Sequence, residues 1–226
     1  YQIPASLVGS EMCIRDSQAY SVIEVSDPKR KKALAELCAD QVQIHQSPTF
    51  LVFCADLNRD RLAGQLHGVK NFDTDYVEAL LIATVDAALV LQNVALAAES
   101  HGLGICMIGA IRIHPKAVGK LLNLPPLVYA VAGLCLGYPA KDQQQKPRLP
   151  LETILHHEQY SEDNQQIGHI KGYDQTMVEF YSSQAMHDKD PRWSKVMAAR
   201  TARFHERAEL DEYLSDQGFH FKSSTP

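Results

Sequence analysis

Residues 77–98 read VEALLIATVDAALVLQNVALAA, and this stretch decides the fold. A helix built from it would be apolar on nearly every face, which predicts a buried central helix, closed at its end by Gly102. Two apolar runs of strand length lie on either side of it in the sequence, Phe50–Ala55 (FLVFCA) and Val128–Leu136 (VYAVAGLCL). Continuous apolar strands are typical of a sheet covered on both faces. The sequence therefore predicts helices packed on both sides of a sheet.

Shorter elements surround this core. The run YSVIEV at residues 20–25 alternates like a strand, and Asp27-Pro28 then begins a helix that reaches Cys38. Aspartate is a good N-cap residue, and proline fits the first helical position. Further elements are expected as a strand at 104–108 and helices at 58–66, 115–122, near 173–184 and near 192–217.

Composition excludes several classes of protein. The chain has 226 residues, a formal net charge of −5 and a pI of about 6.1, whereas nucleic-acid-binding proteins usually carry a basic face. Its five cysteines are widely spaced and form no CxxC pair, so neither a disulfide framework nor a zinc cage is expected. A reducing cytoplasm is the expected location, and no secretory signal is recognised at the start of the sequence.

The long apolar stretch is not predicted to span a membrane. Glu78, Asp86 and Gln92 interrupt it, whereas a spanning helix needs about 20 nearly uninterrupted apolar residues. Asp86 and Gln92 are interpreted as hydrogen-bonded residues at an interface between packed elements.

The segment 101–112 (HGLGICMIGAIR) holds three glycines but is not a dinucleotide-binding fingerprint. Met107 stands where the third glycine of that motif belongs, and the segment follows a helix where the motif follows a strand. One interpretation is structural: Gly102 caps the helix and Gly104 opens a tight strand. The other is functional: Gly109 lets backbone N–H groups come close to a flat ligand.

Two later segments carry candidate ligands. In KPRLP, Lys146 and Arg148 flank a proline, and such a pair suits a phosphate group, although an ordinary solvated basic loop is an equally good interpretation. The run His156-His157-Glu158 suggests a metal, but adjacent histidines point apart and no third ligand is suitably spaced. No metal site is predicted.

The order of these motifs resembles the flavin-dependent nitroreductase superfamily. The matching pieces are SVIEV, FLVFCADLNR, a long apolar helix ending AAESHGLG, then MIGAIR, GLCLGYPA and KPRLP. The resemblance covers residues 18 to about 219, and within the superfamily the chain is similar to bacterial oxygen-insensitive NADPH nitroreductases and NADPH–flavin oxidoreductases. The combination of GLCLGYPA with KPRLP at this separation is more specific than either motif alone.

The resemblance implies an α+β fold, with a central mixed sheet flanked by helices, in an intertwined homodimer that holds FMN at its interface. Family members often have an aromatic residue where Met107 stands, and glycine or serine where Ala110 stands. The residues that match the family's flavin contacts are Gln41, Met107, Ile108, Gly109 and Ala110 for the ring, and Lys146 and Arg148 for the ribityl phosphate.

The activity that the resemblance implies is an NAD(P)H oxidoreductase of the nitroreductase or flavin reductase type. FMN would take hydride from NADPH or NADH and pass two electrons, in a ping-pong cycle, to nitroaromatics, quinones or free flavin. No catalytic residue is expected, because the cofactor carries the chemistry. The alternatives are a non-catalytic flavin-binding protein and a truncated, inactive fragment.

The truncation alternative comes from the start of the chain. Residues 1–17 (YQIPASLVGSEMCIRDS) differ from the helix with an HRSxR-like motif that begins family members, and they are interpreted as a foreign segment. The expected organisation is this segment, then a flavin-binding domain at residues 18–160, and then a helical C-terminal extension at residues 161–226. The extension is expected to pack on the core or on the partner subunit.

Overall fold

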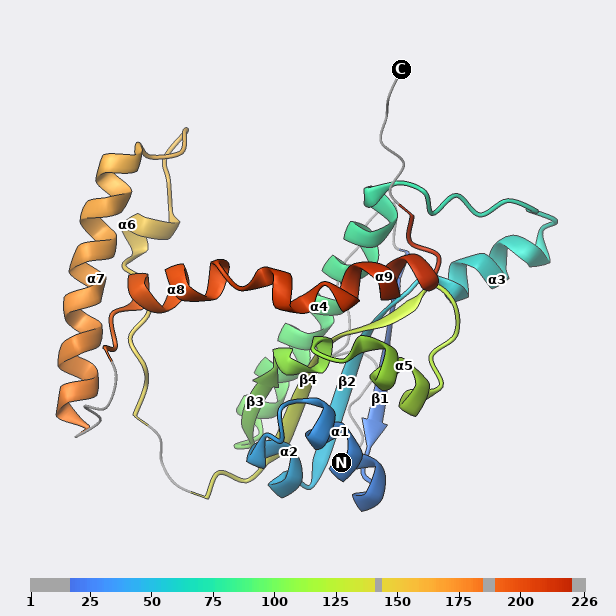
Figure 1. Ribbon diagram of the computed structural model, residues 1–226, viewed down its shortest axis with the longest axis horizontal. Helices are drawn as coiled ribbons and strands as arrows, with labels where there is room; N and C mark the ends of the chain where they lie inside the picture. The colour runs from blue at the N-terminus through green and yellow to red at the C-terminus, as the bar shows by residue number, and fades with distance from the viewer. Residues whose placement is uncertain (1–16, 141–143, 185–189, 221–226) are drawn as a thin grey trace. The chain divides into compact units, whose positions relative to one another are not determined.

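The computed structural model describes residues 17–140, 144–184 and 190–220 (Figure 1). The chain forms two compact units. The first comprises Tyr1–Ala140 together with Arg207–Pro226, and the second comprises Lys141–Glu206. The segment expected to be foreign, residues 1–17, lies outside the described residues apart from Ser17.

The first unit contains the sheet and the helices that cover it. Its elements are β1 (Tyr20–Val25), α1 (Pro28–Leu37), α2 (Val42–Gln46), β2 (Thr49–Asp56), α3 (Asn58–Leu66), α4 (Val77–Ser100), β3 (Gly104–Ile108), the 3-10 turn η2 (Gly109–Arg112), α5 (Pro115–Leu122), β4 (Val128–Gly137) and α9 (Glu209–Asp216). The second unit is helical. Its elements are α6 (Leu151–Ile154), α7 (Asp163–Ser183) and α8 (Trp193–Thr201), and the 3-10 turn η3 (Phe204–Arg207) joins the two units along the chain.

The four strands form one sheet in the order β1-β2-β4-β3. The α+β class is confirmed. A mixed sheet was expected, but within the described residues every pair of neighbouring strands is antiparallel. In the described part of the chain β1 and β3 are the edge strands, each with one neighbour. A mixed sheet would need a further, parallel strand beside one of them.

Local sequence accounts for the elements that were predicted. Asp27 accepts a hydrogen bond from the backbone N–H of Arg30 (2.8 Å), and Pro28 occupies the first turn of α1. In β2 all residues from Phe50 to Asp56 are buried, as expected for a strand covered on both faces.

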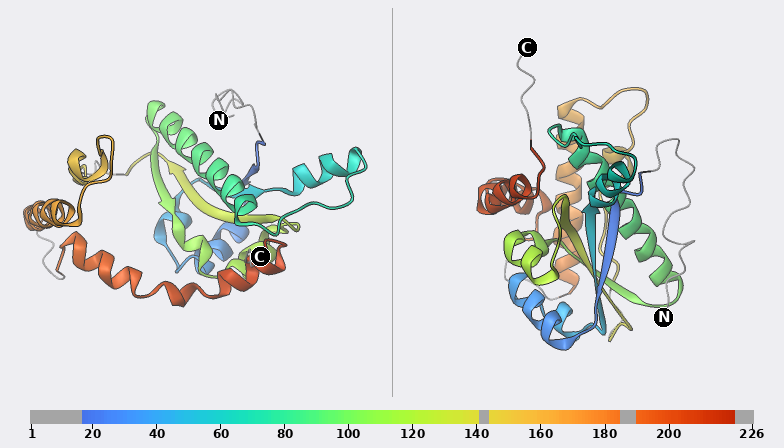
Figure 2. Two further views of the ribbon diagram at one scale, coloured as in Figure 1. Left: turned by 90° about the horizontal axis from the view of Figure 1, so that it is seen from above. Right: turned by 90° about the vertical axis from the view of Figure 1, so that its right-hand side faces the viewer.

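The two faces of the sheet are covered by different helices (Figure 2). On one face α4 packs on β2 and β4, and Val90 and Leu91 belong to the same buried cluster as Phe53. The opposite face is covered by α1, α2, α5 and η2. Residues that pack together there include Leu34, Ile44, Phe50, Val52, Ile108, Ile111, Val118 and Cys135.

Helix α4 is buried on one face only. Leu81, Val85 and Leu89 are about half exposed in the chain by itself, in contrast to the fully buried helix that its composition predicted. By length and composition α4 could cross a membrane, and it is the one such helix among the described residues. Because the core helix of a soluble protein passes the same test, the packing of α4 on the sheet is the more informative observation.

The C-terminal helices differ from their expected bounds. Helix α7 begins at Asp163, ten residues before the expected start, because the polar segment DNQQIGHIKG is helical as well. The expected helix over 192–217 is divided into α8, η3 and α9. Helix α9 returns to the first unit, where Tyr213 and Phe219 pack against Tyr129.

Candidate functional site

The glycine-rich segment 101–112 begins with a structural cap. Gly102 has a left-handed backbone (φ 74°), its N–H donates to the carbonyl of Glu99 (2.9 Å), and the N–H of Leu103 donates to that of Ala98 (3.0 Å). These two bonds form a Schellman motif, which ends α4 and aims the chain into β3. At Gly104, a Cβ atom would lie 3.4 Å from the carbonyl oxygen of Gly137. The structural interpretation of Gly102 and Gly104 is therefore confirmed.

The four residues predicted to line a flavin, Met107 to Ala110, follow at the end of β3. Met107 is 47% exposed and Gly109 is exposed, whereas Ile108 (1%) and Ala110 (8%) are buried in the core beneath the sheet. Successive strand residues point to opposite faces, which explains why Met107 faces outward and Ile108 inward at the end of β3, whereas Gly109 and Ala110 belong to η2. A ligand above this segment would therefore contact the side chain of Met107 and the backbone of the other three residues.

Gly109 leaves open space above the backbone. A Cβ atom built there would come within 4 Å of one atom, Nη2 of Arg112, at 3.8 Å. A planar ligand could approach the backbone at this point. Because the Ala110 side chain faces the core, having alanine where family members have glycine or serine does not narrow this approach.

Arg112 was not singled out by sequence reasoning. Its side chain is half-buried and donates a hydrogen bond from Nη1 to the carbonyl of Val131, which holds the guanidinium beside Gly109. Burial, and secondarily the charge of Arg207, lower the pKa of Arg112. A fixed, partly desolvated positive charge thus lies next to the exposed segment. The signal in the sequence was the arginine that closes MIGAIR.

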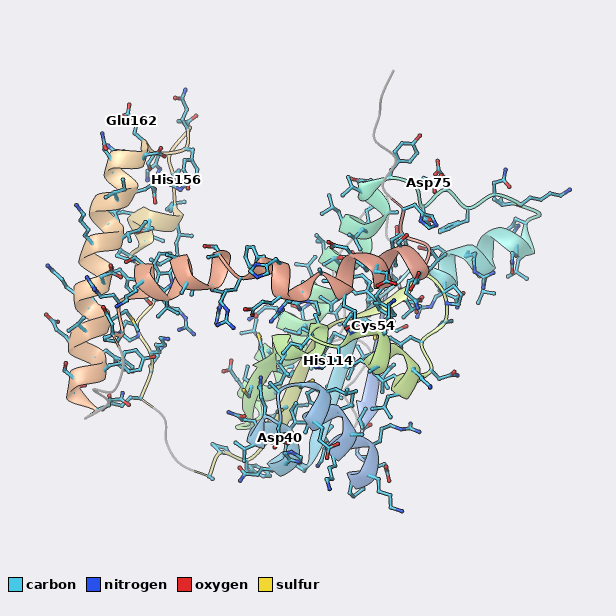
Figure 3. The ribbon with its side chains drawn as sticks, in the orientation of Figure 1. Asp40, Cys54, Asp75, His114, His156 and Glu162 are labelled. Atoms are coloured by element: carbon cyan, nitrogen blue, oxygen red, sulfur yellow. The ribbon has the colours of Figure 1, made fainter. Side chains whose placement is uncertain are left out.

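Gln41 is placed by a strained turn. Ala39 (φ 62°) and Asp40 (φ 51°) both have left-handed backbones, which is uncommon for residues other than glycine. Asp40 Oδ1 lies 2.7 Å from Nε2 of His45, a side-chain hydrogen bond between the turn and α2. Asp40 is labelled in Figure 3. Gln41 occupies the N-cap position of α2, and Ile44 of that helix packs in the same core cluster as Ile108. Strain of this kind is found preferentially at functional sites.

Lys146 and Arg148 belong to the second unit. Both side chains are exposed, and Nζ of Lys146 lies 5.5 Å from the centre of the Tyr181 ring. The loop between them is fixed by Tyr173, whose hydroxyl donates to the carbonyl of Pro147 (2.9 Å). Two cations are thus held on a braced loop, an arrangement that suits a phosphate group.

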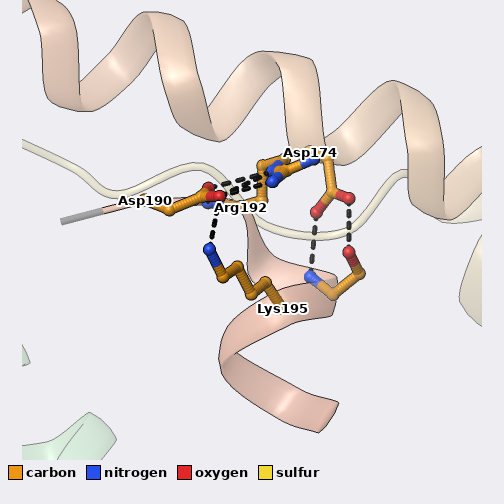
Figure 4. Close-up of polar contacts among 5 residues, drawn as sticks. Asp174, Asp190, Arg192 and Lys195 are labelled. Carbon is orange, nitrogen blue, oxygen red and sulfur yellow. Dashed lines mark hydrogen bonds and ion pairs between the residues drawn. The ribbon is translucent and has the colours of Figure 1, made fainter. Parts of the chain in front are cut away.

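Polar contacts hold the start of α8 in the second unit (Figure 4). Asp174 of α7 accepts hydrogen bonds from the backbone N–H of Ser194 (2.8 Å) and from its hydroxyl (2.5 Å). Nε of Arg192 donates to both carboxylate oxygens of Asp190 (2.9 and 3.0 Å), and Nζ of Lys195 donates to one of them (3.0 Å). These hydrogen bonds, those from Arg192 foremost, hold the pKa of Asp190 well below its usual range. Both carboxylates thus have partners within the second unit.

The cysteines and histidines have structural surroundings. Burial raises the pKa of the Cys54 thiol to about 12 and that of the Cys135 thiol to about 11, so neither is an activated nucleophile. His156 accepts a hydrogen bond from the backbone N–H of Ser161 (3.2 Å) and stacks on Tyr160 at 4.2 Å (Figure 3). Among the described residues, no three histidine, cysteine or acidic side chains are grouped to hold a metal ion.

Comparison with known proteins gives consistent matches. A sequence model of the "Nitroreductase family" matches residues 10–138, and one of the "Nitroreductase family, C-terminal domain" matches residues 146–222. The chain is 38% identical over 205 residues to "FMN reductase [NAD(P)H]" of Bacillus subtilis, covering 90% of this chain and 82% of the relative.

Two further similarities agree with these. The chain is 36% identical over 202 residues to "Oxygen-insensitive NADPH nitroreductase" of Salmonella typhimurium, covering 89% of this chain and 81% of the relative. The solved structure of a hypothetical oxidoreductase, YcnD from Bacillus subtilis, matches with a TM-score of 0.91 and 36% identity, over 96% of this chain and 87% of that one.

Proposed function

This chain belongs to the nitroreductase family, and we infer that it is an FMN-dependent NAD(P)H oxidoreductase. The observation that carries this function is its similarity to an NAD(P)H-dependent FMN reductase over 90% of the chain. One relative is named as a reductase of FMN and another as a nitroreductase. These names support flavins and nitro compounds as the electron acceptors of the present chain.

The residues present fit FMN. The segment Met107–Ala110 offers an exposed side chain at Met107 and an open backbone at Gly109, which suit the flat face of the flavin ring. Gln41, on its strained turn, supplies an amide that can donate to or accept from the polar edge of the ring. Lys146 and Arg148 supply the charge for the ribityl phosphate.

When bound, FMN supplies two-electron hydride chemistry between NAD(P)H and the acceptor. This chain's own residues bind and orient, and none is required as a general base. Arg112 contributes a fixed positive charge beside Gly109, and such a charge favours negative charge that develops on a ligand above it. The backbone N–H groups near the open glycine add dipoles of the same sign.

The active assembly that we propose is a homodimer of this chain. Leu81, Val85, Leu89 and Leu96 form one exposed apolar stripe along α4, at the spacing that places residues on one face of a helix. Large exposed apolar patches mark interaction sites. A second copy of the chain would cover this stripe, as the resemblance to homodimeric flavoproteins implies. We place the protein in the cytoplasm, where the free thiols of its described cysteines remain reduced.

We further propose the organisation that the sequence predicts: a foreign segment at residues 1–17, a flavin-binding domain at residues 18–160, and a helical extension at residues 161–226. The bounds of the compact units differ from these, because the first unit ends at residue 140 and residues 207–226 return to it. The nitroreductase family model also begins at residue 10, within the first segment.

The alternatives, a flavin-binding protein without activity and an inactive fragment, are separated from the enzyme by one anaerobic experiment. Addition of NADPH or NADH bleaches the visible absorbance of bound FMN if the chain is an oxidoreductase. Bound FMN that neither donor bleaches would contradict the proposed activity.

A further inference from the structure

Three of the described cysteines lie together beneath the sheet, next to the proposed flavin segment. Cys106 is in β3, Cys135 is in β4, and Cys38 caps the end of α1. Cys38 and Cys135 belong to the buried cluster that includes Ile108, and Cys106 packs against this cluster. All three are free thiols. Their positions are far apart in the sequence, so the grouping depends on the fold.

Cys106 and Cys135 are directly opposite each other in the sheet. Strands β3 and β4 are antiparallel, and their register pairs these two residues. Opposite residues of antiparallel strands have side chains on the same face and Cα atoms about 4.5–5.5 Å apart, within the range of roughly 4.4–6.8 Å that a disulfide requires. Their Cβ atoms are about 4.5–5.5 Å apart, whereas a disulfide needs about 3.5–4.5 Å. A bond between the two sulfur atoms would therefore draw the strands together by about 1 Å.

Strand β3 can make this movement more easily than a central strand. Within the described sheet it is an edge strand of five residues, and β4 is its one neighbour. Its last two residues, Met107 and Ile108, begin the proposed flavin segment. A disulfide at Cys106 would therefore displace the backbone that the flavin ring contacts.

The two thiols differ in exposure. Cys106 is partly exposed, whereas Cys135 is buried. Burial raises the pKa of Cys106, and it raises the pKa of Cys135 to about 11, so both thiols are protonated at neutral pH and react slowly compared with an activated cysteine. An oxidant from solution meets Cys106 first, and Cys135 is the neighbour that can react with it next.

We propose that Cys106 and Cys135 form an oxidisable dithiol, which closes to a disulfide beside the flavin segment and weakens the binding of FMN. The oxidant is a hydroperoxide, of which hydrogen peroxide is the simplest. Sγ of Cys106 attacks one peroxide oxygen, the O–O bond breaks, and a sulfenic acid and water form. Sγ of Cys135 then attacks that sulfur, the S–S bond forms, and a second water leaves. In total the two thiols are oxidised and one hydrogen peroxide is reduced to two waters, and exchange with a small thiol such as glutathione restores the dithiol.

The effect on FMN rests on the proposed function, whereas the disulfide itself does not. Reduced flavin that meets oxygen yields hydrogen peroxide, so an FMN-dependent oxidoreductase can supply the oxidant. In a reducing cytoplasm the dithiol is the resting form, and the disulfide persists only while peroxide is present.

The test treats the full chain with hydrogen peroxide, blocks the remaining thiols, and maps the peptides by mass spectrometry without a reducing agent. We expect one pair of peptides joined through Cys106 and Cys135, which a reducing agent separates. The dissociation constant of FMN is measured by flavin fluorescence before oxidation, after oxidation and after reduction again. Loss of one hydrogen bond to the ligand predicts binding that is weaker by about fivefold in the oxidised chain and is restored by reduction.

Variants identify the reacting pair. Cys106→Ser and Cys135→Ala should both fail to form the joined peptides, and peroxide should leave the FMN binding of Cys106→Ser unchanged. Cys54→Ala is the matched control, because Cys54 is also buried but has Ser21 and Ala130 opposite it in the sheet (Figure 3). This control should keep both the disulfide and the fivefold change. Circular dichroism shows whether each variant is folded.

The outcomes are distinct. Joined peptides of Cys106 and Cys135, with FMN binding that weakens reversibly, support the proposal. A folded chain that forms no such pair under peroxide, or that joins Cys135 to Cys38 instead, would overturn it. A disulfide that leaves FMN binding unchanged would overturn the effect on the flavin segment. If the reduced chain binds no FMN, the proposed function is wrong, and the peptide map alone decides whether the dithiol oxidises.

Discussion

Gly133 in the centre of β4 offers a sharp test of the packing beneath the proposed flavin segment. A Cβ atom at this position would lie 2.3 Å from Cζ and 2.6 Å from Cε2 of Phe50, and 3.3 Å from Cβ of Ile108. Favourable carbon–carbon contacts need about 3.5 Å or more. In Gly133→Ala the Phe50 ring must therefore move by more than about 1 Å, although its surroundings are fully packed.

The cost can be worked from these distances. Overpacking of a core costs about 1–3 kcal/mol, and because the new methyl group would come so close to a buried ring, we expect a cost near the upper end of that range. Replacement of glycine within a strand returns roughly 0.5–1 kcal/mol of backbone entropy. The expected net loss in the free energy of unfolding is about 2 kcal/mol, or a Tm lower by roughly 4–8 °C for a chain of this size.

Urea denaturation followed by circular dichroism measures this loss, in protein freed of flavin so that ligand binding does not shift the midpoint. Phe50→Leu removes the ring that the new methyl group would strike. Because the two residues are in contact, the double variant should be more stable than the sum of the single losses by about 1 kcal/mol or more. Additive losses, within about 0.5 kcal/mol, would refute the assigned contact.

Three other predictions follow from the site and its supports. Gly109 has open space above it, so Gly109→Ala should change the free energy of unfolding by less than about 0.5 kcal/mol. The larger side chain of Gly109→Leu should weaken FMN binding without changing Tm. Equal FMN binding by the two variants would contradict the open approach of the flavin to this backbone. Burial raises the pKa of Cys54 from 9.0 to about 12, so the folded state holds this proton more tightly and the free energy of unfolding should fall as pH rises from about 9 toward 12. Urea denaturation at pH 8 and 10.5 should show a smaller fall in the free energy of unfolding for Cys54→Ala than for the unaltered chain. An equal fall in the two proteins would show that this thiol does not contribute. Val85→Arg places a charge in the exposed apolar stripe of α4 and should convert the dimer into a monomer in sedimentation experiments. The control Glu99→Arg, near the end of the same helix, should remain a dimer. A dimeric Val85→Arg protein would place the interface elsewhere.

Much of the first unit could be predicted from the sequence because its signals are local. The cap and proline at Asp27-Pro28 begin α1, and the apolar runs of β2 and β4 have the length of buried strands. The extent of α7 could not be predicted in the same way. Its first turns, DNQQIGHIKG, are polar and contain two glycines, and their two apolar residues, Ile167 and Ile170, are too few to indicate a helix by themselves.

The candidate site shows the same limit. The segment Met107–Ala110 could be singled out because its glycine stands at the end of a strand, and Lys146 and Arg148 because they flank one proline in KPRLP. Whether a residue points outward or into the core depends on the register of β3 on β4, which the sequence does not specify. Arg112 lies beside Gly109 because its side chain donates to the carbonyl of Val131, a contact between η2 and β4 that the sequence does not specify.

The most direct test of the account is the visible absorbance spectrum of the purified full chain and of its Lys146→Ala, Arg148→Ala double variant. The full chain should carry the absorbance of bound FMN, which NADPH or NADH bleaches without oxygen. The double variant should lose the flavin while remaining folded, because the charges that hold the phosphate are gone. Flavin occupancy unchanged in the double variant would contradict the phosphate role, and a full chain that stays colourless after addition of FMN would contradict the function itself.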